Sequence, residues 1–139
     1  MPQHGDMESS TMQIVSWIVR GLVAAIFLVM GVNHFRPRLA RGMAASIPPA
    51  FRWNGVLRPL NLVYFTGVCE LAGGVGILIP VTSLAAAICL VVFLVAVFPA
   101  NAHLAAHPEK FGRASIPFWP RLIAQLVLIA IVLVAGLLR

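Results

Sequence analysis

The chain has 139 residues, of which 60% are hydrophobic and only 10% are charged, whereas soluble domains carry about a quarter charged residues. This composition excludes a soluble globular domain, because too few polar side chains are present to cover a surface that faces water. The formal net charge of +6 does not indicate nucleic-acid binding, because it reflects a scarcity of acids: Asp6, Glu8, Glu70 and Glu109 are the only four.

Four apolar segments are each about long enough to cross some 30 Å of hydrocarbon as a helix. The N-terminus lacks the basic region of a signal peptide, so we expect the first segment to remain as a membrane helix. The four residues 80–83 are too short to join anything but an antiparallel hairpin. The sequence therefore predicts one all-α domain over residues 1–139, a transmembrane four-helix bundle with antiparallel neighbours, with helices at about 14–35, 60–79, 84–101 and 122–138.

The two longer connections, 36–59 and 102–120, hold most of the basic residues. The opposite side carries Arg139 and the acidic N-terminal segment. The positive-inside rule then predicts that both loops are cytoplasmic and both termini lie outside the cell membrane. A short interfacial helix is expected at 39–47, where arginines would meet anionic lipid head groups or a phosphate-bearing ligand.

Glu70 lies near the middle of the apolar run 60–79. A charge at that depth costs about 3 kcal/mol or more, which predicts a partner inside the bundle. We expect this partner to be Arg20, because the two residues are predicted to lie roughly 15 Å and 9 Å below the outer surface, a gap that an arginine can bridge. The pair is either a structural lock between helices or a carboxylate that handles protons or binds a ligand.

A second polar group is predicted at the opposite membrane edge, where His34 and His103 end two helices beside Asn33 and Asn101. These residues either line a polar opening between the helices, or are only exposed to water and hydrogen-bond the backbone carbonyls at the helix ends. We expect no metal site among these residues. The two cysteines have no CxxC spacing, so neither a disulfide framework nor a metal centre is expected.

Three sequence stretches together resemble the DoxX and DoxX-like family of small membrane proteins: GVNHFRP at 31–37, GVCELAGGVGILIP at 67–80 and FPANAH at 98–103. The resemblance covers the first three helices, and the fourth is similar only in hydropathy. It implies a four-helix membrane bundle whose membrane glutamate maps onto Glu70 and whose asparagine maps onto Asn101. Some relatives are linked to quinone-coupled sulfur oxidation or to oxidative-stress complexes with soluble redox enzymes, and a distant group resembles receptor-assembly chaperones.

From these observations we expect a non-catalytic membrane accessory protein or subunit of DoxX-like type, with Glu70 and Arg20 as its polar centre. The alternative is a quinone-linked redox protein, an oxidoreductase subunit, in which Glu70 transfers the proton. A small-molecule transporter or assembly chaperone ranks third, since no inverted repeat is evident. The expected partners are the lipid bilayer, a soluble or membrane redox enzyme and a second copy of the chain. The candidate ligand-binding residues are Arg20, Phe27, His34, Glu70, Asn101 and His103.

Overall fold

The computed structural model describes residues 4–138, which contain six α-helices, three short 3₁₀ helices and no strand. The predicted all-α class is confirmed. The elements in chain order are α1 (His4–Asn33), α2 (Pro37–Ser46), η1 (Pro49–Phe51), η2 (Gly55–Leu57), α3 (Pro59–Leu78), α4 (Ser83–Ala106), α5 (Pro108–Phe111), η3 (Gly112–Ala114) and α6 (Phe118–Leu137).

Helices α1, α3, α4 and α6 are each long and apolar enough to cross a membrane. Large apolar side chains on their outer faces are exposed, among them Leu22, Val95 and Leu126, as expected of surfaces that contact lipid. The protein is therefore a multi-pass membrane protein. Arg139, which entered the predicted orientation, lies outside the described residues.

The helix bounds differ from the predicted ones mainly at polar or proline-containing ends. Helix α1 begins at His4 rather than at 14, since acids in a first turn are favoured by the helix dipole. Helix α4 continues through Pro99 to Ala106 instead of ending at 101. Helix α6 begins at Phe118, because Pro120 falls in its first turn, where no backbone N–H is needed.

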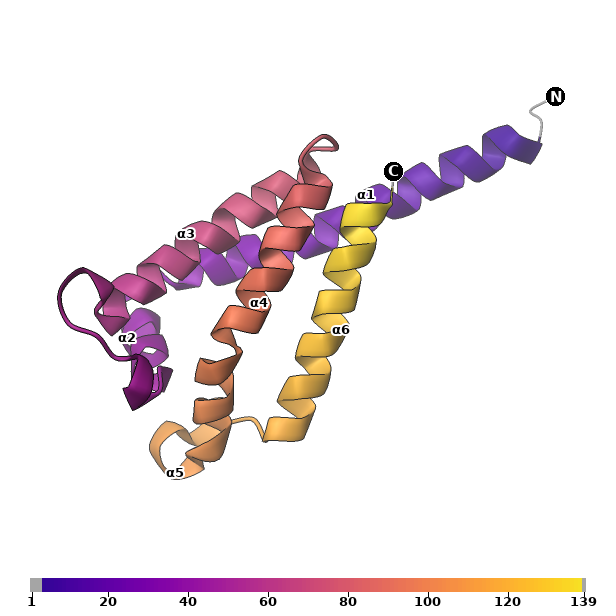
Figure 1. The fold of residues 1–139 in the computed structure, drawn as a ribbon. Helices are drawn as coiled ribbons and strands as arrows, with labels where there is room; N and C mark the ends of the chain where they lie inside the picture. The colour runs from indigo at the N-terminus through magenta and orange to yellow at the C-terminus, as the bar shows by residue number, and fades with distance from the viewer. Residues whose placement is uncertain (1–3, 139) are drawn as a thin grey trace.

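Figure 1 shows two antiparallel helix pairs, α1 with α3 and α4 with α6. The pairs meet at the turn between α3 and α4, where the Thr82 hydroxyl donates to the Gly76 carbonyl at 2.8 Å. From this turn α3 and α4 diverge toward α2 and α5, so that the helices form a V. Helix α2, close to the expected 39–47, packs against α3.

Glycines set the register between α1 and α3. A Cβ on Gly67 would lie 2.6 Å from the Cβ of His34, and one on Gly74 would lie 3.2 Å from the Leu28 side chain. The backbones approach this closely because small residues allow it. Because the two helices are antiparallel, each residue further along α3 lies level with one residue earlier in α1.

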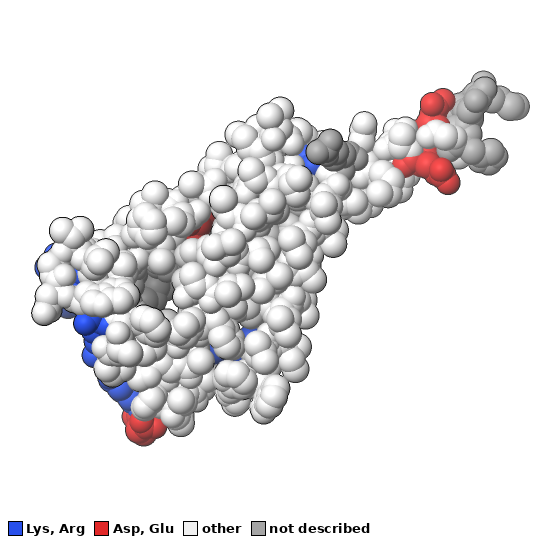
Figure 2. Space-filling view, viewed as in Figure 1, with Lys and Arg blue, Asp and Glu red and all other residues white. Residues whose placement is uncertain are grey.

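The buried core lies where the two helix pairs meet. Phe27 of α1, Ile77 of α3, Leu90 of α4 and Val132 of α6 are at most 1% exposed. Most charged side chains lie away from this centre, and Arg20 and Glu70 are the buried exceptions. Figure 2 shows acidic side chains on the part of α1 that projects beyond the bundle, and basic side chains along the opposite end, near α2 and α5.

Candidate ligand-binding cleft

A large cleft occupies the V between the two helix pairs, with a volume of about 1700 Å³. In Figure 2 the surface is hollowed between α3, α2 and α4. Most of its walls are apolar, with aromatic side chains from Phe27, Phe65 and Phe93. Apolar clefts with a few polar groups are typical of small-molecule sites. The charged, amide and imidazole groups that line it are His34, Glu70, Asn101, Arg121 and Gln125.

Glu70 and His34 form the deepest polar group of the cleft. Glu70 is 6% exposed and His34 is 9% exposed. The His34 Nδ1–H donates to the Met30 carbonyl at 2.8 Å, and the same nitrogen lies 3.0 Å from Glu70 Oε2. This second contact lacks hydrogen-bond geometry, so the fully buried Oε2 accepts no hydrogen bond from a described residue. A buried acceptor without a partner is costly, and its place in a cleft wall marks Glu70 as a candidate ligand contact.

The predicted pairing of Glu70 with Arg20 is wrong. The glycine contacts place Gly67 beside Gly31 and His34, and Gly74 beside Ala24. At equal steps, Arg20 therefore comes level with Leu78 at the end of α3, about eight residues or about 12 Å along the helix from Glu70. That distance exceeds the reach of an arginine side chain, and Arg20 lines a separate pocket with Pro80.

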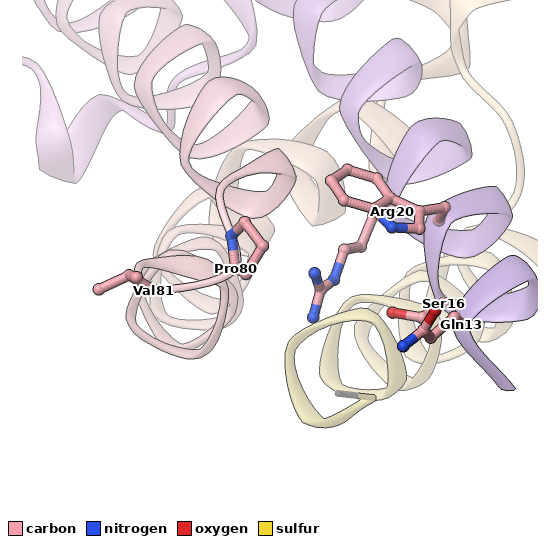
Figure 3. A pocket seen from close by; sticks show the side chains of 6 residues that line it. Gln13, Ser16, Arg20, Pro80 and Val81 are labelled. Atoms are coloured by element: carbon pink, nitrogen blue, oxygen red, sulfur yellow. The ribbon is translucent and has the colours of Figure 1, made fainter. Parts of the chain in front are cut away.

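Arg20 instead holds the C-terminus of α6. Its Nε donates to the Ala135 carbonyl at 3.2 Å and its Nη2 donates to the Leu138 carbonyl. Figure 3 shows the guanidinium directed from α1 toward the end of α6, across from Pro80 and Val81. Carbonyls at a helix C-terminus lack intrahelical partners and carry the negative end of the dipole. They stabilise this buried charge, which is 3% exposed, without a carboxylate.

We expect Arg20→Gln to lower stability without changing ligand binding. The variant loses two hydrogen bonds from a charged donor, each contributing roughly 1.5–3 kcal/mol, and frees the last turn of α6. Thermal unfolding of the purified protein should begin several degrees lower than in the wild type. Arg38→Gln, which removes an exposed arginine, is the matched control and should have no effect; equal melting temperatures for both variants would contradict the role given to Arg20.

A second polar network joins α4 to α6 within the cleft wall. Arg121 Nη1 donates to Asn101 Oδ1 at 3.0 Å, and Asn101 Nδ2 donates to Gln125 Oε1 at 3.3 Å. Gln125 Nε2 donates to the Leu94 carbonyl at 2.8 Å, in the stretch of α4 that Pro99 disturbs. The network fixes the amide of Asn101 and the guanidinium of Arg121 at the mouth of the V.

The structure brings together four of the six predicted site residues: Phe27, His34, Glu70 and Asn101 all line the cleft. Arg20 and His103 do not. The ring of His103 lies 4.2 Å from that of His107, so the two predicted histidines do not form one polar mouth.

Sequence reasoning missed Arg121 as a cleft residue. It follows Asn101 by twenty positions across a turn whose path depends on α5 and η3. The sequence does place polar residues near the ends of two consecutive helices, α4 and α6. Their pairing could not be predicted, because it depends on where each helix ends.

Residues 23–135 match the family described as Domain of unknown function (DUF8561). The chain belongs to this family. All the cleft residues lie within the segment that matches DUF8561, whereas Arg20 lies just outside it. Neither the curated proteins nor the solved structures contain a match to this chain. The resemblance to the DoxX family thus stays a hypothesis.

Proposed function

We propose that this protein is a non-catalytic integral membrane subunit of DoxX-like type that binds a lipid-soluble molecule with a polar head group in the cleft between α3 and α4. The observation that carries the proposal is the buried, unpartnered carboxylate oxygen of Glu70 in a wall that is otherwise largely apolar. The apolar part of such a ligand would pack against the apolar walls, and its polar head group would hydrogen-bond the carboxyl group of Glu70.

Quinones are the ligand class that fits this combination and that the DoxX resemblance implies. Phe27 and Phe93 offer apolar contact to a ring and its tail, and an uncharged Glu70 would donate to a quinone carbonyl. When bound, a quinone supplies reversible electron and proton uptake. The residues of this chain would bind and orient it, and a partner redox enzyme would exchange the electrons.

The proposal is tested with the purified protein and a short-chain quinone. Cys69 and Cys89 both line the cleft and neither forms a disulfide, so their labelling by a membrane-permeant maleimide reports on its occupancy. We expect saturable quinone binding that protects both thiols from labelling. A variant with Cys89→Ser isolates Cys69, the neighbour of Glu70. Unsaturable uptake with labelling unchanged would contradict the proposal.

The runner-up is a redox subunit in which Glu70 itself transfers the proton. The 3.0 Å approach of His34 Nδ1 to Glu70 Oε2 favours it, because the imidazole is a second proton-carrying group at the same point. The two functions differ in one result: when Glu70→Gln still binds quinone but blocks turnover with a partner enzyme, proton transfer is favoured over binding alone.

We also infer the orientation from charge. The basic residues of both long connections lie at one end, and the acids of α1 lie at the other. The positive-inside rule then gives cytoplasmic loops and external termini. A single cysteine introduced by Ser115→Cys in a chain without Cys69 and Cys89 should resist an impermeant maleimide added to intact cells; labelling from outside would reverse the orientation.

A further inference from the structure

Arg121 is a cation whose charge has no evident counter-ion. Its Nη1 and Nη2 donate to Asn101 Oδ1 and to the Ala114 carbonyl, at 3.0 and 2.9 Å. Both acceptors are neutral. Its Nε is fully buried and has no hydrogen-bond partner among residues 4–138. Among residues 4–138 the one acid–base contact is that between His34 and Glu70, so no described carboxylate pairs with Arg121.

The buried Arg20 and the partly buried Arg121 are compensated differently. Arg20 lies at the C-terminus of α6, where the helix dipole is negative. Arg121 lies three residues after the start of the same helix, where the dipole is positive. The dipole therefore adds to the charge of Arg121 instead of offsetting it, and no described side chain neutralises it, so an anion from outside the chain would be bound favourably here.

The position of Arg121 in the bundle indicates which class of anion could bind there. At about 1.5 Å per residue, Arg121 lies only about 5 Å inside the end of α6, which is near the level of lipid phosphates. It also lines the cleft, whose neighbouring wall residues Val97, Ala124 and Leu128 are apolar. A phospholipid fits both features, because its phosphate would contact Arg121 and its hydrocarbon chain would pack along these apolar residues.

We propose that Arg121 binds the phosphate of an anionic phospholipid whose acyl chain lies in the cleft. The network of Asn101 and Gln125 orients the guanidinium for this contact. The inference does not depend on the proposed quinone site, because it rests on a different residue and a different end of the cleft.

Native mass spectrometry of the purified protein tests this proposal with two probes of identical acyl chains, phosphatidylglycerol and phosphatidylcholine. The wild type should retain one phosphatidylglycerol at least about tenfold more strongly than phosphatidylcholine, because the choline cation of phosphatidylcholine already offsets the charge of its phosphate. Arg121→Gln should lose this preference, whereas Arg121→Lys should keep part of it. Equal retention of the two lipids by the wild type would overturn the proposal even if Arg121→Gln does not fold.

Arg113→Gln is the matched control, because Arg113 is an exposed arginine of the same connection. This variant should retain phosphatidylglycerol like the wild type. A loss in Arg113→Gln equal to that in Arg121→Gln would show general attraction to a basic surface and overturn the assigned site. Inorganic phosphate at millimolar concentration should not displace the lipid, and displacement would identify a free-anion site in its place.

Discussion

Glu70→Gln is expected to leave the protein folded in the membrane and to weaken quinone binding by up to about tenfold. The amide keeps the shape of the side chain, and its oxygen still faces His34 Nδ1 at the position of Oε2. What it loses is the carboxyl O–H, whose neutral hydrogen bond to a quinone carbonyl contributes roughly 0.5–1.5 kcal/mol, and the amide N–H replaces this donor only in part. The binding isotherm of the short-chain quinone measures the change, beside the yield of folded protein.

Glu109→Gln is the matched control for this variant, because Glu109 is an exposed acid in the short helix α5. It should bind quinone like the wild type. If Glu70→Gln fails to accumulate while Glu109→Gln does, Glu70 serves the fold, and the claim that it meets a ligand loses its support. If both variants bind quinone normally, Glu70 does not contribute to binding, and only a loss of turnover with a partner enzyme in Glu70→Gln would keep it in the site as a proton carrier.

Gly67→Ala should destabilise the bundle by about 1–3 kcal/mol, as overpacking of a close contact does. The added Cβ would lie 2.6 Å from the Cβ of His34 and 3.2 Å from the Gly31 carbonyl. Neither atom is the free end of a flexible side chain, so α1 and α3 must separate. Because His34 moves with α1, ligand binding should weaken as well. Thermal unfolding in detergent and the quinone isotherm measure the two effects.

Gly21→Ala supplies the comparison, since it is the same substitution in the interior of α1. A Cβ at Gly21 meets nothing within 4 Å, and alanine favours a helix over glycine by up to about 1 kcal/mol. This variant should therefore melt at or above the wild-type temperature. A Gly67→Ala protein as stable as Gly21→Ala would contradict the close packing of α1 against α3.

The sequence was sufficient for the architecture because membrane spans follow from hydropathy and length. It also identified Glu70 as the buried acid, because a single charged side chain within a membrane span is too costly to expose to lipid. Its partner could not be obtained in the same way. The depth argument counted residues from the expected helix ends, but the register of α1 depends on where Gly31, Gly67 and Gly74 meet side chains of the other helix.

Among the remaining site residues, too, some could be predicted from the sequence and others could not. His34 and Asn101 were expected near helix ends and do line the cleft, yet His103, two residues after Asn101, points elsewhere. A difference of two residues turns a helical side chain by about 200°. Arg121 was hidden for a related reason, because its neighbour Asn101 is determined by the angle between α4 and α6 and not by sequence distance.

The most direct test of the cleft as a binding site is to map where a photoreactive short-chain quinone attaches. After irradiation and proteolysis, the adducts should lie on the cleft faces of α3 and α4, at residues such as Thr66, Cys69 and Phe93, and excess unlabelled quinone should abolish them. Adducts confined to the lipid-facing residues Leu22 and Leu126, undiminished by competitor, would contradict the account.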